Sequence, residues 1–142
     1  MKNSKPRIAV VGAGYWGKNL IRNYAELGSL CAICDSNEKA LEAFKDFYPG
    51  VPCLTSFQDL VLSKDIDGVA IAAPAEMHFS LAREALLSGK DVFVEKPLAL
   101  SLSDAHELKD IAEKHERILM VGHLLQYHSA FIKLKELIRK GE

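Results

Sequence analysis

The fold is decided near the start of the chain by the stretch Ile8-Ala9-Val10-Val11-Gly12-Ala13-Gly14-Tyr15-Trp16-Gly17. Its first four residues are apolar and predict a buried strand, and the helical spacing of apolar residues over 15–27 predicts a helix. The glycines between them form a G-x-G-x-x-G pattern. Because the pattern follows a strand and opens a helix, it predicts a loop that binds a dinucleotide.

Each glycine has a separate task in such a loop. Gly12 permits the tight turn, Gly14 lets the backbone approach a pyrophosphate, and Gly17 lets the helix pack close to the strand. The helix N-terminus adds free N–H groups and the positive end of a dipole. The competing interpretation is a plain strand-to-helix turn.

Strand-like and helix-like stretches alternate over the whole length. Parallel strands that are apolar on both faces and alternate with helices imply a sheet covered on both sides. We therefore expect a single α/β domain over 1–142, a doubly wound parallel sheet (Rossmann fold) with its ligand site at the carboxyl ends of the strands. Further strands are expected over 30–34, 68–72, 92–94 and 118–121, and further helices over 37–47, 56–62, 76–88, 103–115 and 129–140.

An acidic residue follows the second strand. Asp35 lies 18 residues after Gly17, close to the spacing at which a carboxylate receives the adenosine ribose hydroxyls. Neither Ser36 nor Asn37 supplies an arginine for a 2′-phosphate, so NAD is favoured over NADP. The alternative role is a helix cap, supplied by Asp35 or Ser36, and the two roles of Asp35 can coexist.

Composition excludes several function classes. The 142 residues suit one domain, and 18 basic against 19 acidic residues leave a net charge of −1, which gives no drive toward nucleic acid or a membrane surface. The apolar run before Gly12 is too short for a signal peptide, so we expect a cytoplasmic protein. Cys31 and Cys34 form a C-x-x-C spacing, but they lie in an expected strand, where positions three apart face opposite sides, so no metal site is expected.

A charged pair follows a later strand. Glu95-Lys96-Pro97 comes directly after Val92–Val94, at the ligand edge of the expected sheet. The Lys96 ammonium can hydrogen-bond a substrate hydroxyl and stabilise negative charge that develops on its oxygen. A surface Glu-Lys pair before a loop is the alternative.

These stretches, with Pro74, His78 and Val121-Gly122-His123, resemble the N-terminal domain of the glucose–fructose oxidoreductase and inositol dehydrogenase family (GFO/IDH/MocA). The resemblance covers essentially the whole chain, and Gly-Tyr-Trp-Gly-Lys-Asn with Glu-Lys-Pro-Leu-Ala-Leu-Ser looks nearest to nucleotide-sugar members such as UDP-N-acetylglucosamine 3-dehydrogenases. It implies hydride transfer between a sugar ring carbon and C4 of the nicotinamide of NAD.

The resemblance also implies roles for single residues. Lys96 occupies the position of the catalytic lysine, the Lys96–Pro97 bond is often cis in relatives, and Lys96 and His123 are candidate substrate contacts. The implied cofactor-binding residues are Gly12, Gly14, Tyr15, Trp16, Gly17, Asp35, Ala73, Pro74, His78, Glu95, Lys96 and Gln126. Ala73 and Ala75 replace a frequent Thr and a frequent Asn, which removes polar contacts to the cofactor, and Gln126 stands where many relatives carry Arg.

Family members have a second domain that supplies most of the substrate pocket, an acid/base histidine and the surface through which they oligomerise. We therefore expect a cofactor-binding half that is inactive alone. The alternatives are a non-catalytic dinucleotide-binding or redox-sensing module, which leaves Lys96 without a role, and an S-adenosylmethionine-dependent methyltransferase, which does not need that lysine.

Overall fold

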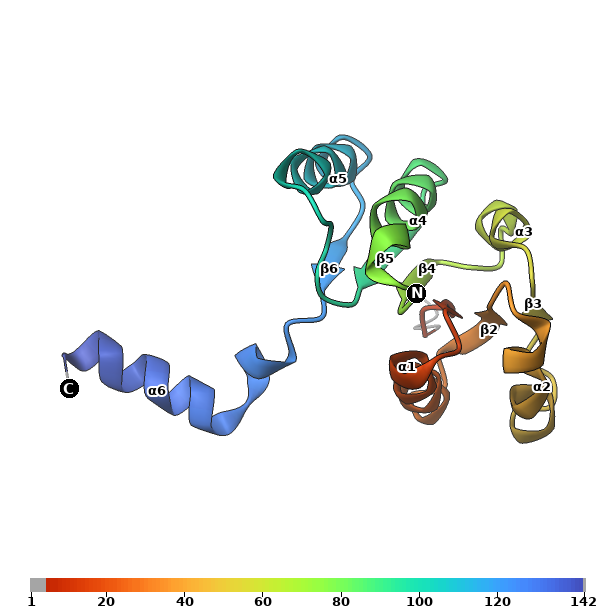
Figure 1. The fold of residues 1–142 in the computed structure, drawn as a ribbon, viewed down its shortest axis with the longest axis horizontal. Coiled ribbons are helices and arrows are strands. Elements are labelled where there is room, and N and C mark those ends of the chain that lie inside the picture. Colours follow the sequence, from red (N-terminus) through yellow and green to blue (C-terminus); the bar gives the residue numbers. More distant parts are fainter. Residues whose placement is uncertain (1–4, 142) are drawn as a thin grey trace.

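The computed structural model describes residues 5–141 as one parallel sheet with helices on both faces (Figure 1). Residues 1–4, part of the segment considered as a signal peptide, and Glu142 lie outside the described residues. In chain order the elements are β1 (Ile8–Val11), α1 (Tyr15–Glu26), β2 (Leu30–Cys34), α2 (Glu38–Phe47), β3 (Cys53–Leu54), α3 (Phe57–Leu62), β4 (Gly68–Ile71), α4 (Ala75–Leu87), β5 (Asp91–Val94), α5 (Leu102–Lys114), β6 (Leu119–Val121), the 3-10 helix η1 (Leu124–Tyr127) and α6 (Ser129–Lys140).

The strand order is β3-β2-β1-β4-β5-β6, and every neighbouring pair is parallel. This order reverses between β1 and β4, and such a reversal places the ligand crevice at the carboxyl ends of those strands. The doubly wound α/β fold expected from the sequence is thus confirmed.

Alternate residues of each strand enter two separate cores. Val10, Ile33 and Ala70 pack with α1 and α2, whereas their neighbours Ala9 and Val69 pack with α3, α4 and α5. Figure 1 shows these two groups of helices on opposite faces of the sheet. Burial on both faces explains why the strands read as continuous apolar runs.

Side-chain caps mark where several helices begin. Ser56 and Ser101 accept hydrogen bonds from Asp59 N and Asp104 N and so start α3 and α5. The prediction that Asp35 or Ser36 caps α2 is wrong, since the side chain of Asn37 accepts from Lys39 N.

The last helix departs from the layered arrangement. α6 has the expected bounds, yet all twelve of its residues are described and none is buried. It contacts η1 and extends away from the sheet (Figure 1). The expectation of helices on both faces therefore holds for β1 to β4 better than for β5 and β6.

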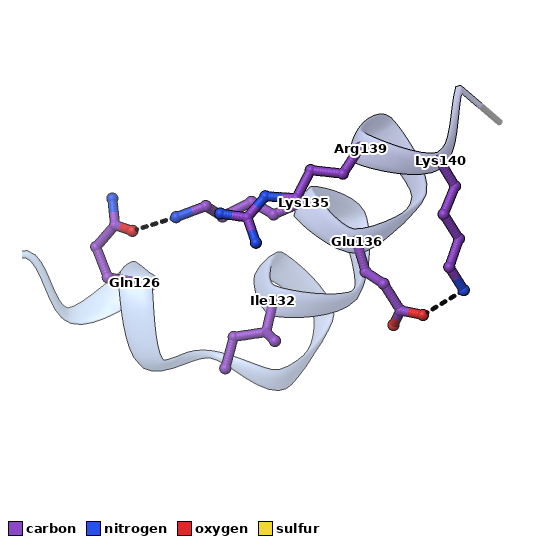
Figure 2. A pocket seen from close by; sticks show the side chains of 6 residues that line it. All are labelled: Gln126, Ile132, Lys135, Glu136, Arg139 and Lys140. Atoms are coloured by element: carbon purple, nitrogen blue, oxygen red, sulfur yellow. Dashed lines mark hydrogen bonds and ion pairs between the residues drawn. The ribbon is translucent and has the colours of Figure 1, made fainter.

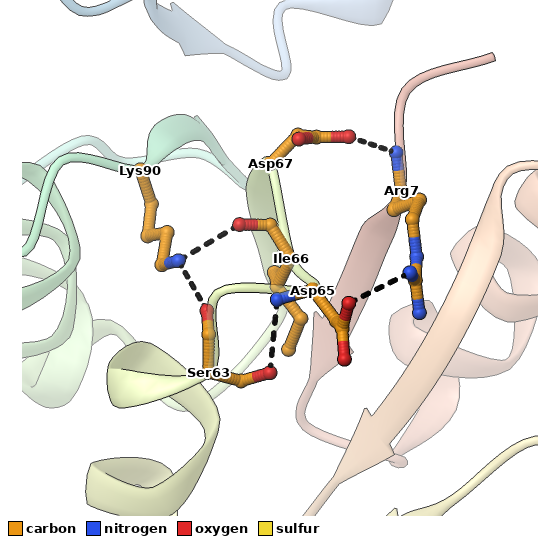
Figure 3. A network of polar contacts seen from close by, with 6 residues as sticks. All are labelled: Arg7, Ser63, Asp65, Ile66, Asp67 and Lys90. Atoms are coloured by element: carbon orange, nitrogen blue, oxygen red, sulfur yellow. Dashed lines mark hydrogen bonds and ion pairs between the residues drawn. The ribbon is translucent and has the colours of Figure 1, made fainter. Parts of the chain in front are cut away.

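At the amino edge of the sheet a buried lysine joins the loop before β5 to the loop before β4 (Figure 3). Lys90 is 7% exposed, and its Nζ donates to Ser63 O at 2.5 Å and to Ile66 O at 2.8 Å. Beside it the Arg7 amide donates to Asp67 Oδ2 at 2.7 Å. These contacts fix the loop that leads into β4 at the amino edge of the sheet. The carboxyl edge, where a ligand is expected, takes no part in them.

Candidate functional site

The loops that follow β1, β4, β5 and β6 start in register at the carboxyl edge of the sheet. The strand ladders continue one residue beyond each strand, because the first loop residue still donates its amide to the neighbouring strand. The bonds are Gly12 N to Cys34 O at 2.8 Å, Ala72 N to Val11 O at 2.8 Å, Glu95 N to Ile71 O at 2.9 Å and Gly122 N to Val94 O at 2.8 Å. Residues far apart in the sequence thereby share one rim.

The glycine loop has the shape that the motif predicts. Gly12 has φ +92°, and a Cβ there would lie 2.7 Å from Ala72 O. A Cβ on Gly17 would overlap Gly12 O, so the helix packs directly against the loop. At Gly14, in contrast, a Cβ would meet nothing within 4 Å. Protein packing therefore requires Gly12 and Gly17, whereas the space at Gly14 is left for a bound group.

The N-terminus of α1 faces this open space. Gly14 is its N-cap and provides no side-chain cap, and the first turn contains no acidic residue. The first N–H groups of a helix have no partner inside the helix, so they and the dipole suit a pyrophosphate. Tyr15 and Trp16 are exposed there, with their rings edge to face and 5.7 Å between centroids. These features fit the phosphate part of a dinucleotide.

Asp35 lies at the end of β2, beside the glycine loop. Its Oδ2 accepts from Ala13 N at 2.7 Å and its Oδ1 accepts from Asn37 N at 2.8 Å. The two amides orient the carboxylate, and each oxygen keeps a second lone pair for a further donor. Asp35 is thus in the right place for ribose hydroxyls, and it organises the loop before α2 without being its cap.

A pocket of about 460 Å³ lies between the glycine loop and the loops after β5 and β6. It brings together residues from four segments of the chain. They are Trp16, Glu95, Lys96, Gly122, His123, Leu124, Leu125, Gln126 and Phe131. Five of the residues that the sequence singled out share this pocket.

The floor of this pocket carries a buried acid. Glu95 is 7% exposed, and a Cβ on Gly122 would lie 3.1 Å from Glu95 Oε2 and 3.0 Å from Phe93 Cζ. Gly122 therefore makes room for the carboxylate. The neighbouring Lys96 is exposed, and the Lys96–Pro97 peptide bond is cis, as the resemblance implies.

The loop after β4 offers a ligand few polar side chains, so main-chain atoms make up most of its polar surface. Ala73 is half-buried, and Pro74 is exposed as the N-cap of α4. His78 is only 2% exposed and lies under this loop, with its ring nitrogens at hydrogen-bond distance from Pro97 O and Ala73 O. Direct cofactor contacts of these three residues stay predictions.

Gln126 lies between the pocket and α6. Its Oε1 accepts from Lys135 Nζ at 3.0 Å, so α6 already engages its amide (Figure 2). A second hollow of about 520 Å³ runs along α6 and is lined by Gln126, Ile132, Lys135, Glu136, Arg139 and Lys140. Its lining includes neither Lys96 nor any residue of the glycine loop, so we assign the chemistry to the smaller pocket. A cofactor contact of Gln126 stays a prediction.

Three residues of the pocket were not singled out in the sequence, and they form its apolar walls: Leu124, Leu125 and Phe131. Gly122 belongs to the Val121-Gly122-His123 stretch of the resemblance, but its task of making room for Glu95 was not predicted. The signal for the two leucines was their place shortly after a strand at the ligand edge. Phe131 comes from α6 and gave no such signal.

The cysteines are free thiols. Cys31 lies where the register between β1 and β2 shifts, so it packs beside the same core as Cys34 and not on the opposite face. Burial, aided by the Asp35 carboxylate, raises the pKa of Cys34 to about 11, which disfavours the thiolate that redox and metal chemistry need.

Over residues 5–141 there is no cluster of three His, Cys, Asp or Glu side chains suited to a metal ion. Each helix in that range also falls short of the length and apolar character that a bilayer crossing requires.

Known proteins with similar sequences include dehydrogenases of inositol and of a nucleotide sugar. The chain is 30% identical over 141 residues to inositol 2-dehydrogenase from Salmonella paratyphi B. The matched region covers 96% of this chain and 42% of that protein. The chain is also 28% identical over 135 residues to UDP-N-acetylglucosamine 3-dehydrogenase from Acidithiobacillus ferrooxidans, and that match covers 92% of this chain and 41% of the relative. The chain thus spans about two fifths of the length of these relatives.

A solved structure shows the same fold with ligands. The WlbA dehydrogenase from Bordetella pertussis, in complex with NADH and UDP-GlcNAcA, superposes with a TM-score of 0.89 at 28% identity, covering 97% of this chain and 44% of that one. The family model described as "Oxidoreductase family, NAD-binding Rossmann fold" matches residues 6–123. That match includes the glycine loop, Asp35 and Glu95-Lys96-Pro97. The chain therefore belongs to this NAD-binding oxidoreductase family, the GFO/IDH/MocA family.

Proposed function

We propose that this chain is the cofactor-binding part of an enzyme that transfers a hydride between NAD and a ring carbon of a sugar or nucleotide sugar. The observation that carries the proposal is the 460 Å³ pocket, which places Lys96 and Glu95 opposite Trp16 of the glycine loop. In a dehydrogenase, a lysine at the rim of a dinucleotide site can act on the substrate hydroxyl, whereas a non-catalytic binding module has no substrate on which it could act.

Residues of this chain can bind separate parts of the dinucleotide. The open space at Gly14 and the α1 N-terminus suit the pyrophosphate, and Asp35 suits the adenosine ribose. The carboxylate at Asp35 repels a 2′-phosphate, which favours NAD over NADP. When bound, the nicotinamide supplies the carbon that accepts or returns the hydride.

Lys96 acts on the substrate hydroxyl in this proposal. Its ammonium donates a hydrogen bond to the oxygen at the reacting carbon, holds the ring in place and stabilises negative charge on that oxygen. Glu95 accepts hydrogen bonds from hydroxyl groups above it, including those of the nicotinamide ribose. Leu124, Leu125 and Phe131 give one side of the pocket an apolar surface.

We further propose that the chain alone binds NAD but turns over little or no substrate. The relatives are more than twice as long as this chain, and the Lys96 side chain is exposed at the edge of the pocket. The acid/base group and the oligomer contacts then come from further protein, and the cytoplasmic location stays a prediction.

The test uses the complete protein, meaning this chain with any further residues that its gene encodes. It is incubated with NAD and, separately, with inositols, simple hexoses and UDP-N-acetyl sugars while reduced nicotinamide is followed at its absorbance band. Turnover with a sugar, lost in K96A and kept in the exposed-lysine control K109A, supports the proposal. NAD binding without turnover of any of them favours the redox-sensing alternative.

A further inference from the structure

One buried histidine bridges two loops of the site. His78, in the first turns of α4, has Nδ1 2.6 Å from Pro97 O and Nε2 2.8 Å from Ala73 O, both within hydrogen-bond range. Its ring is 2% exposed, so neither nitrogen has ready access to water instead. A buried histidine is usually satisfied by one or two partners, but here both partners are main-chain atoms of ligand-site loops.

The bond to Pro97 lies next to the exposed lysine. On one side of Lys96 the chain is fixed by Glu95 N, which donates to Ile71 O at 2.9 Å. On the other side it is fixed by Pro97 O, which the His78 ring holds. The main chain at Lys96 is therefore tethered on both sides, although its side chain is exposed.

The bond to Ala73 links this tether to the glycine loop. A Cβ on Gly12 would lie 2.8 Å from Ala73 N, so the Ala73 backbone packs directly on the turn of that loop. The ring of His78 thus connects the segment that carries Lys96 to a segment that touches the pyrophosphate cradle. Carbonyl oxygens only accept, so a ring nitrogen that bonds one of them donates its N–H.

We propose that His78 is a positioning residue that sets Lys96 relative to the cofactor cradle by bonding both loops at once. The role of Lys96 in this inference rests on the proposed dehydrogenase function. Rate depends steeply on the placement of a group that acts on the reacting atom, whereas cofactor affinity depends on the cradle itself. Loss of the ring should therefore lower kcat far more than it weakens NADH binding.

The kinetic test compares H78L, which removes both donors, with H78Q, which keeps two N–H groups on one nitrogen, in the complete protein. H106L is the matched control, since His106 is an exposed histidine of α5. We expect kcat to fall at least about tenfold in H78L with the NADH dissociation constant within about threefold of the parent. H78Q should recover part of kcat, and H106L should match the parent. An unchanged kcat in folded H78L, or equal losses of kcat and NADH affinity, would overturn the proposal.

A second measurement needs no activity and uses this chain. Nitrogen-15 relaxation should show the Lys96 amide more mobile in H78L than in the parent. If the complete protein shows no dehydrogenase activity, the proposed function fails, and this relaxation measurement still decides whether His78 fixes the loop. A Lys96 amide equally rigid in both proteins overturns the proposal. If H78L does not fold, the same comparison with H78Q decides.

Discussion

The Asp35 carboxylate accepts a hydrogen bond from the Ala13 amide, with 2.7 Å between Asp35 Oδ2 and Ala13 N. This bond joins the acid after β2 to the glycine loop after β1, so the group that selects the cofactor and the loop that binds it are held as one unit. The same carboxylate bonds Asn37 N through its other oxygen. An asparagine at this position keeps one of these bonds, because its amide has a single acceptor oxygen, and the ratio of two cofactor affinities in one variant isolates the effect of the charge.

For D35N we expect the preference for NADH over NADPH to fall at least about tenfold. One negative charge near a 2′-phosphate contributes on the order of 1.4 kcal/mol to that preference, and the variant removes it. Parallel calorimetric titrations with the two reduced cofactors measure the ratio. D46N, which neutralises an exposed acid of α2, serves as the control. A preference unchanged in D35N would contradict the role of this charge.

Two glycine substitutions separate folding from binding. In G14A the new methyl group enters open space, so the melting temperature should change little while NADH affinity falls at least about tenfold. In G17A the methyl group overlaps the Gly12 carbonyl, so we expect a loss of at least about 2 kcal/mol of unfolding free energy. Urea unfolding and NADH titration of both variants test the pair. Equal effects of the two substitutions on stability would count against the assigned roles.

Replacing Lys96 should remove chemistry without harming the fold. The side chain is exposed, so K96A should unfold within about 0.5 kcal/mol of the parent and bind NADH with nearly unchanged affinity. Turnover of the complete protein should nevertheless fall at least about a hundredfold. Steady-state kinetics beside urea unfolding measure both, with K109A as the exposed-lysine control. Full turnover in K96A would rule out the lysine's proposed role.

At the other edge of the sheet, K90M should destabilise the protein by about 2–4 kcal/mol. The variant removes two hydrogen bonds from a charged donor and leaves the carbonyls of Ser63 and Ile66 without their partner (Figure 3). K109M, at a fully exposed lysine, should leave the stability nearly unchanged. The comparison is made by urea unfolding, and a K90M variant as stable as K109M would show that the tether contributes little.

Stability should also fall in alkaline solution because of a buried thiol. The pKa of Cys34 is raised by burial to about 11 from an ordinary value of 9.0, so the unfolded chain loses this proton at lower pH than the folded one. Its contribution to stability is complete below about pH 9 and is lost as the pH rises through about 11. Between pH 8 and 10.5 we expect the parent to lose about 1 kcal/mol more than C34A in urea unfolding. Identical losses in the two proteins would refute the assignment.

The fold was predictable because its strands are buried on both faces and its glycine loop has a fixed spacing. The two-residue β3 was not predicted, since Cys53 and Leu54 are too few to show a period. The cap of α2 was misassigned because both oxygens of Asp35 bond other amides, Ala13 N among them. That bond is between residues 22 apart, and local sequence rules do not report it.

The same limit applies to the site. The order of loops at the sheet edge follows from parallel topology, so the neighbourhood of Lys96 and the glycine loop could be foreseen. The partners of His78 and the bond from Lys135 to Gln126 depend on how a helix lies over a loop. Such contacts are decided by three-dimensional packing, which spacing in the sequence does not encode.

We expect this chain to bind NAD at the glycine loop with the nicotinamide end near Trp16, the chain's only tryptophan. The most direct measurement is a titration of the chain with NADH that follows Trp16 fluorescence. We predict saturable quenching with energy transfer to the reduced nicotinamide, weaker for NADPH and much weaker in G14A. No change with either cofactor, tighter binding of NADPH, or saturation by S-adenosylmethionine instead would contradict it.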